Sequence, residues 1–151
     1  MTLTGNRIWA VFAALATILT LWSAPTPATA QVTAFKQAVA EGAARDKDIA
    51  AFYQANGYKS IWTGNTGRER KRRAELIKAL SNAGDHGLPV SRYDPQSLMA
   101  KMKAARSPRD LGLVEVELSR VFLQYSRDVQ TGVLVPSRID SRIVRQVPYR
   151  D

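Results

Sequence analysis

Cysteine is absent from all 151 residues of the chain. The protein can therefore form no disulfide, no thiolate metal site and no cysteine nucleophile. Histidine occurs once, at His86, within the turn sequence GDHGLP. We interpret His86 as a capping residue just past a helix C-terminus, with a ligand contact as the alternative, because no catalytic partner is evident beside it.

Acidic residues are scarce relative to basic ones, 13 against 22, which gives a formal net charge of +9. Such a chain is attracted to polyanions, namely nucleic acid, anionic lipid or cell-wall polymers. The export predicted below argues against nucleic acid as a partner. A basic surface that only aids solubility is the other interpretation.

Long apolar runs are also absent, with one exception at the N-terminus. Arg7 precedes the uncharged run Ile8–Trp22, and Ala28 and Ala30 fit the small-residue pattern of a cleavage site. At about 1.5 Å per residue the run falls short of a bilayer core, so an uncut anchor is the weaker reading. We expect residues 1–30 to be a cleaved signal peptide. An exported chain without disulfides suggests a periplasmic location.

No stretch alternates long enough to indicate a sheet, and apolar residues recur at helical spacing along the rest of the chain. We expect a lead-in helix within residues 31–45 and a helical domain over residues 46–151. Its helices are predicted after a cap at Asp46, over 68–83, after Asp94, over 107–131 and over 137–147. The fold prediction is an all-α, compact orthogonal bundle of five or six helices. The ending VPYRD suggests that the domain is truncated.

The longest predicted helix has the clearest signals. Ser107 is its expected cap, Pro108 its first residue, and Asp110 the acid of a capping box. Its apolar positions fall within an arc of roughly 100°, as Leu111, Val114, Leu118, Val121, Phe122, Tyr125 and Val129. Three more apolar residues, Leu113, Val116 and Leu123, lie outside this arc. This helix should therefore lie centrally, with neighbours on two sides.

Two charged features of the sequence are candidate sites. The basic run Arg68, Arg70, Lys71, Arg72 and Arg73 opposes the dipole of the helix that it begins, which suggests an anion-facing patch for a cell-wall polymer or lipid phosphate. The alternative is a solvated helix start whose charges Glu69 and Glu75 offset.

Glu115 lies at the edge of the apolar arc of the longest helix, near Ser119. A carboxylate at this place must be partly desolvated or paired. We expect an arginine from another helix as its partner. A single acid that cleaves glycans is the alternative, and no other residue of the sequence supports it.

Aromatic residues are few but concentrated in FYQANGYKSIWTG, residues 52–64. Phe52 and Tyr53 are expected on a helix that stops at Gly57. Tyr58 and Trp62 are expected on an extended piece that folds back against this helix and buries the rings. A surface groove that stacks on a sugar or peptide is the alternative.

These stretches together resemble the N-terminal scaffold domain of the large murein L,D-transpeptidases. The resemblance rests on FYQANGYKSIWTG, LIKALSNAGDHGLPVSRYDP and VEVELSRVFLQYSRDVQTGVLVPSRID, and it covers about residues 46–140. The matching positions are Tyr53, Tyr58, Trp62, His86, Gly87, Leu88, Tyr93, Leu118, Tyr125, Gly132 and Pro136. It implies an exported helical domain in which these residues are structural markers rather than active-site groups.

In that family the scaffold precedes a peptidoglycan-binding module and a catalytic domain with a cysteine in a Ser-His-Gly-Cys type motif. This chain has no cysteine, so no catalytic residue, metal or cofactor is assigned. We expect a non-catalytic scaffold segment whose partners are the missing downstream domains, peptidoglycan or other envelope proteins. The alternative is a stand-alone periplasmic module that binds peptidoglycan or anionic lipid through residues 68–73.

Overall fold

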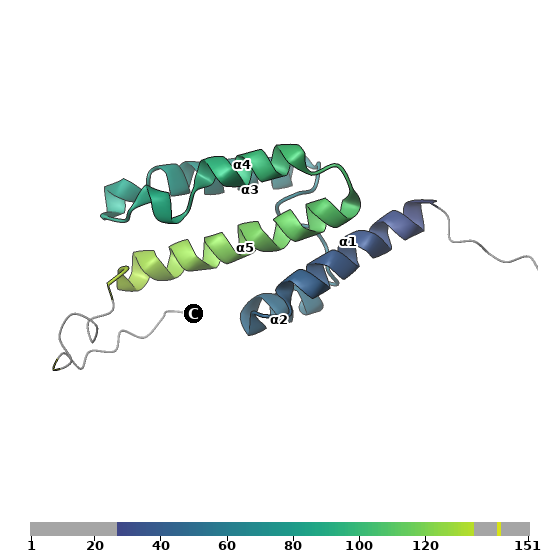
Figure 1. Ribbon diagram of the computed structural model, residues 1–151, viewed down its shortest axis with the longest axis horizontal. Helices are drawn as coiled ribbons and strands as arrows, with labels where there is room; N and C mark the ends of the chain where they lie inside the picture. The colour runs from purple at the N-terminus through teal and green to yellow at the C-terminus, as the bar shows by residue number, and fades with distance from the viewer. Residues whose placement is uncertain (1–26, 135–141, 143–151) are drawn as a thin grey trace, which may run out of the picture.

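The computed structural model describes residues 27–134 and residue 142, and this part of the chain is helical without strands (Figure 1). The elements in order are α1 Pro27–Ala43, α2 Lys47–Ala55, α3 Gly67–Ser81, η1 Ala83–His86, η2 Val90–Arg92, α4 Pro95–Ala104 and α5 Pro108–Thr131, where η marks a 3₁₀-helix. The all-α prediction is confirmed. The predicted helix over 137–147, the marker Pro136 and residues 1–26 of the expected signal peptide lie outside the described residues.

Local capping signals explain where these helices begin. The carboxylate of Asp46 accepts hydrogen bonds from the backbone amides of Asp48 and Ile49, at 3.1 and 3.2 Å. Ser107 and Asp110 form the predicted capping box at the start of α5. Each cap satisfies amides that have no carbonyl partner within the helix. The predicted starts of α2 and α5 are confirmed because they depend only on neighbouring residues.

α1 begins at Pro27, before the range 31–45 in which the lead-in helix was expected. Proline is compatible with the first position of a helix, because the amide there has no carbonyl to bind. The helix packs along the first half of α5 at very close range. A Cβ atom on Gly112 would lie 2.7 Å from the carbonyl oxygen of Phe35 and 2.8 Å from the Cβ of Ala38. Glycine at position 112 therefore allows the two backbones to approach.

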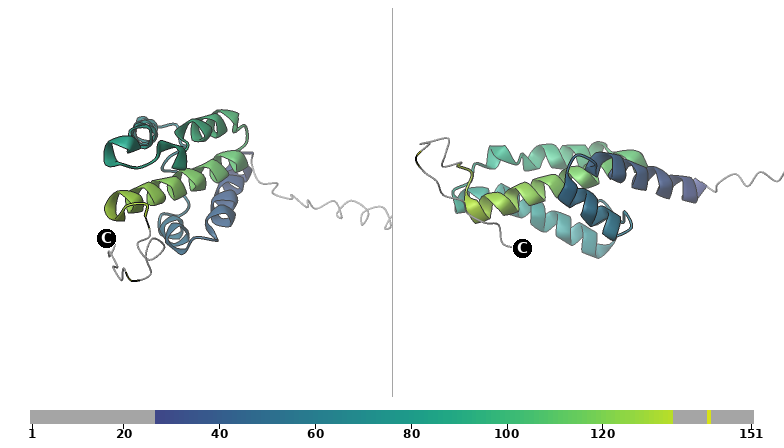
Figure 2. Two further views of the ribbon diagram at one scale, coloured as in Figure 1. Left: turned by 60° about the vertical axis from the view of Figure 1, so that its left-hand side comes forward. Right: turned by 90° about the horizontal axis from the view of Figure 1, so that it is seen from below.

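α5 is the central helix, with α3 and α4 on one side and α1 and α2 on the other (Figure 2). Two apolar clusters form against it. Val114 and Leu118 contact residues of α3 and α4, whereas Val116 contacts the cluster of α1 and α2. The prediction that α5 has neighbours on two sides is confirmed. Among the described residues, no helix is both long enough and apolar enough to span a membrane.

The connection between α2 and α3 differs from the extended piece that the sequence suggested. Gly57 has a φ of 68°, as expected for the stop after α2, but Tyr58 also takes a positive φ, 58°. The side chain of Asn56 supports this turn by accepting from the amide of Lys59 at 3.0 Å. The chain therefore reverses direction before it reaches Trp62, and its amides turn toward α5.

Candidate functional site

The four clustered aromatic residues have different environments. Tyr53 is completely buried and Trp62 is 4% exposed, whereas Tyr58 is only half-buried. Phe52 is 46% exposed, although its ring lies edge-on against Tyr53 at a centroid distance of 5.1 Å. The expected burial is thus correct for Tyr53 and Trp62 and wrong for Phe52. This difference leaves an aromatic surface beside a buried polar centre.

Glu115 is the polar centre of the fold and is completely buried. Its carboxylate accepts hydrogen bonds from the backbone amides of Ile61 and Thr63, at 2.7 and 2.8 Å, and from that of Trp62 at 3.2 Å. The hydroxyls of Tyr53 and Thr63 also donate to it, each at 2.8 Å. The expectation of an arginine partner is wrong, because neutral donors of residues 61–63 surround the carboxylate instead. We call residues 61–63 the clamped segment.

Two arginines of the basic run bind the same segment through its carbonyls. Arg72 donates to the carbonyl of Ile61 at 2.8 Å, and Arg73 donates to the carbonyl of Trp62. The peptide groups of the clamped segment therefore connect a buried anion to two cations. Hydrogen bonds to charged groups are stronger than those between neutral groups. This arrangement gives the arginines at the start of α3 a structural role.

The remaining charges of the run have other surroundings. Arg70 donates to the carbonyl of Asn65, whereas Arg68 and Lys71 are exposed and have no ion-pair partner among the described residues. Glu69 accepts from Thr66 as the acid of a capping box and from the hydroxyl of Ser60 at 2.6 Å. The hydrogen bonds from Ser60 and Thr66 hold the pKa of Glu69 below its usual value. The run is therefore partly structural and partly free at the surface.

Ser119 completes the buried network, one helical turn beyond Glu115. Its hydroxyl oxygen accepts from the indole N–H of Trp62 at 2.8 Å and lies 2.7 Å from the hydroxyl of Tyr53. Burial, and next the nearby charge of Glu115, raise the pKa of Tyr53 far above its usual value. Tyr53 is thus held as a neutral hydrogen-bond donor.

A second polar network holds the other end of α5. The hydroxyl of Tyr93 and Nε of Arg92 both donate to Oδ2 of Asp128, at 2.9 and 2.8 Å. Burial, followed by this hydrogen bond, raises the pKa of Tyr93 to about 12. The ring of Tyr125 lies edge-on against Tyr93, and the ring of the exposed His86 lies at a centroid distance of 6.5 Å from that of Tyr125. Residues far apart in the sequence therefore meet around α5.

The sequence interpretation did not identify Asp128. A signal was available, because Asp128 follows Val121 by two helical turns and lies on the same apolar face of α5. Thr63 could not be recognised in this way, since a loop residue has no periodicity.

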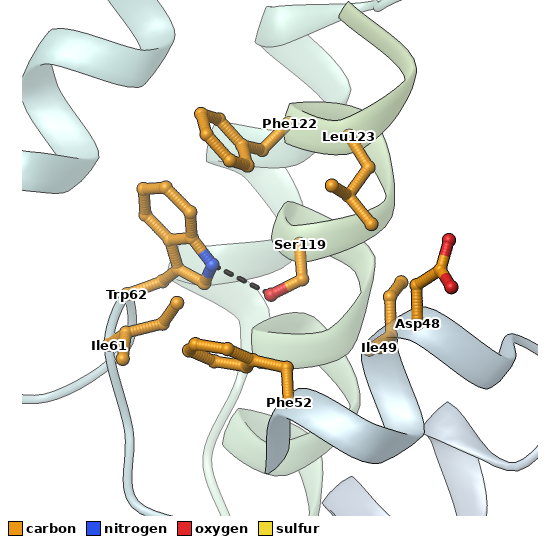
Figure 3. Close-up of a pocket in the computed structure, with 8 residues that line it drawn as sticks. All are labelled: Asp48, Ile49, Phe52, Ile61, Trp62, Ser119, Phe122 and Leu123. Atoms are coloured by element: carbon orange, nitrogen blue, oxygen red, sulfur yellow. Dashed lines mark hydrogen bonds between the residues drawn. The ribbon is translucent and has the colours of Figure 1, made fainter. Parts of the chain in front are cut away.

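The exposed aromatic surface borders a pocket of about 180 Å³. Phe52 from α2, Trp62 from the loop and Phe122 from α5 point toward this hollow (Figure 3). Trp62 and Phe122 are in ring contact at 5.6 Å, and Phe122 is 43% exposed. We call this hollow the aromatic pocket.

The Glu115 network is not arranged for acid–base chemistry. Glu115 has no exposed surface, and donors of the protein itself surround it, so a substrate cannot reach the carboxylate. Within the part of the chain that the structure describes, no three acidic or histidine side chains are grouped to hold a metal ion. The matched residues of both networks thus support the fold.

Residues 47–151 of the chain match the family model described as "Scaffold domain". No match was found among the curated proteins or among the solved structures. The family match covers more than two thirds of the chain, and it includes both polar networks and the clamped segment. The protein therefore belongs to the scaffold-domain family, which confirms its resemblance to the scaffold domain of L,D-transpeptidases.

Proposed function

We propose that this chain is the non-catalytic scaffold segment of an L,D-transpeptidase-like protein that acts in peptidoglycan cross-linking and cell-wall biogenesis. In this proposal the chain is exported by residues 1–30 and works in the periplasm. The catalytic cysteine domain and a peptidoglycan-binding module belong to the same protein and lie outside this chain.

The observation that carries the proposal is the use of the matched residues inside the fold. Tyr53 and Trp62 bind Glu115 and Ser119, and Tyr93 binds Asp128. These side chains form hydrogen bonds inside the fold, as expected for a domain whose role is to position other domains. The scaffold-domain match over 47–151 supports the same conclusion.

An antibody against residues 31–151 tests this function in fractionated cells. The expected result is a periplasmic or envelope band several times heavier than the chain, whose tryptic peptides include a Ser-His-Gly-Cys type motif. Deleting the gene should lower the fraction of stem peptides that L,D-transpeptidation links. A band no heavier than the chain, together with unchanged cross-links, would contradict the proposal.

The second candidate is a stand-alone module that binds peptidoglycan or anionic lipid through residues 68–73. Only Arg68 and Lys71 are available for it, because Arg70, Arg72 and Arg73 donate to backbone carbonyls. Its test is salt-sensitive sedimentation of the chain with sacculi or anionic vesicles, which Arg68→Gln and Lys71→Gln should weaken.

A further inference from the structure

The clamped segment lies where three hollows of the surface adjoin. The aromatic pocket shares Trp62 and Phe122 with a second hollow of about 300 Å³, which also includes Arg72. Ile61 and Arg72 in turn line a third hollow of about 630 Å³, next to the start of α3. An apolar pocket and a polar hollow are therefore neighbours around one rigidly held loop.

The third hollow is basic. It is lined by the cations Lys59, Arg68 and Arg72, and Glu69 is the only acid among the described residues that line it. The carboxylate of Glu69 is already bound by the hydroxyls of Ser60 and Thr66, at 2.6 and 2.7 Å. We call this region the basic hollow. Lys59 and Arg68 are exposed at its edge.

We propose that this surface binds an acidic peptide segment of a partner protein. A bulky apolar side chain of the segment enters the aromatic pocket, and its carboxylates lie beside Lys59 and Arg68 in the basic hollow. The inference goes beyond the scaffold function, since it assigns a binding surface to the domain itself.

The aromatic pocket has the features of an anchor site for one side chain. Its volume of about 180 Å³ is below the range of about 300–1,000 Å³ that encloses a whole small ligand. Phe52 and Phe122 present nearly half of their surface to solvent there. A few side chains that fill such pockets, often aromatic ones, supply most of the binding energy of protein interfaces.

The chemistry of the pocket favours a peptide over a sugar. A sugar ring that stacks on aromatic residues also needs hydrogen-bond partners for its hydroxyls. The hydroxyl of Ser119 is occupied by Trp62 and Tyr53. Asp48 is the other polar lining residue; its side chain is 68% exposed and forms a surface ion pair with Arg127. Apart from the exposed Asp48, the pocket therefore offers apolar contact, which suits a hydrocarbon side chain.

Charge complementarity identifies the second property of the partner. The basic hollow adjoins the aromatic pocket through Ile61, and the chain has a net charge of +9. An acidic segment is attracted to this surface at long range and gains its orientation from the cations. A lipid bilayer is a less suitable occupant, because its planar surface does not enter concave hollows.

Binding of synthetic peptides to the purified full chain tests the proposal. The probes are short fluorescein-labelled peptides that each carry one phenylalanine or leucine and two glutamates at varied spacing. Matched peptides replace glutamate by glutamine, or the apolar residue by alanine. Fluorescence anisotropy measures affinity, and amide NMR shifts of residues 61–63 locate the bound peptide.

Two variants of the proposed surface, each with a control variant elsewhere, distinguish binding at this surface from unspecific effects of the substitutions. Phe122→Ala, and Lys59→Glu combined with Arg68→Glu, should each weaken binding on the order of tenfold. Their controls are Leu113→Ala, equally exposed on α5, and Lys103→Glu, exposed on α4, which should leave affinity unchanged. Added salt should weaken binding of the glutamate peptides and not that of their glutamine counterparts.

The proposal is supported if a glutamate peptide shifts the amides of residues 61–63, and if Phe122→Ala and the Lys59→Glu/Arg68→Glu double variant both reduce its affinity. It is overturned if no peptide of the set produces these shifts, or if the control variants reduce affinity equally. It is also overturned if muropeptides or anionic vesicles produce the shifts and the peptides do not. These results concern the isolated chain, so they are independent of the cellular test of the scaffold function.

Discussion

Glu115 and Arg73 bind the amide and the carbonyl of the same residue, Trp62. The amide donates to the buried carboxylate at 3.2 Å, and the guanidinium of Arg73 donates to the carbonyl. Glu115 belongs to α5 and Arg73 to α3, so one tryptophan backbone joins two helices that are distant in sequence. A loop without regular structure is thereby held between two helices by hydrogen bonds to charged groups.

Replacing Glu115 by glutamine should destabilise the protein strongly. Glutamine keeps one oxygen acceptor and places an N–H₂ group at the other position. Ile61 donates to Oε1 and Thr63 to Oε2, so the buried donors of one of these residues lose their partner. Each unsatisfied buried donor costs about 1–3 kcal/mol. We expect the free energy of unfolding, measured by urea denaturation, to fall by about 2–4 kcal/mol.

Glu117→Gln is the matched control, because Glu117 is also on α5 but pairs with Lys101 at the surface. Glu117→Gln should lower the free energy of unfolding by less than about 1 kcal/mol. Equal losses for the two variants would show that the clamped segment does not depend on the Glu115 carboxylate.

Single substitutions in the basic run, residues 68–73, should show which of its cations stabilise the fold and which only lie at the surface. Arg73→Ala removes the donor to the carbonyl of Trp62 and should cost about 1–2 kcal/mol of unfolding free energy. Lys71→Ala, at an exposed site two residues away, should change it by less than about 0.5 kcal/mol. Similar values for both variants, measured by thermal or urea denaturation, would refute a structural role of Arg73.

The contact of α1 with α5 should be sensitive to a single methyl group. In Gly112→Ala the new Cβ lies 2.7 Å from the carbonyl oxygen of Phe35, so the helices must move apart. We expect a loss of about 1–3 kcal/mol and faster amide exchange along α1. Gly67→Ala is the control, since a Cβ there meets no atom within 4 Å and alanine favours the helix. A stable Gly112→Ala protein with unchanged exchange would contradict the close packing.

The helices were predictable because their signals are local. Asp46, Ser107 and Asp110 cap helices through neighbours within three residues, and the periodicity of α5 shows that it has two buried sides. The need of Glu115 for a partner was also visible, because a carboxylate at the edge of an apolar face cannot remain unpaired.

The identity of the Glu115 partner was not predictable in the same way. A sequence shows the charge of arginine but not the direction of a backbone amide, and the turn at Tyr58 decides that direction. The aromatic pocket and the basic hollow arise likewise from tertiary packing. Lys59 and Phe122 become neighbours of the same loop only when α2, α3 and α5 assemble.

Stability at alkaline pH should depend on Tyr93. Its pKa is raised to about 12 in the folded protein, mainly by burial and next by the hydrogen bond to Asp128, against a value near 10 in the unfolded chain. The folded state therefore holds this proton more tightly. The resulting stabilisation is complete below about pH 10 and is lost as the pH rises toward 12.

Urea denaturation at a series of pH values measures this effect. Tyr93→Phe lowers stability at neutral pH through the lost hydrogen bond to Asp128, by about 1–2 kcal/mol. It should also have a shallower decline of stability between pH 10 and 12 than the unmodified chain. The decline that remains is expected from Tyr53, whose pKa is raised even further by burial.

Tyr58→Phe is the control, because the hydroxyl of Tyr58 has no hydrogen bond among the described residues. Identical declines in the unmodified chain and in Tyr93→Phe would show that the proton of Tyr93 is not coupled to folding.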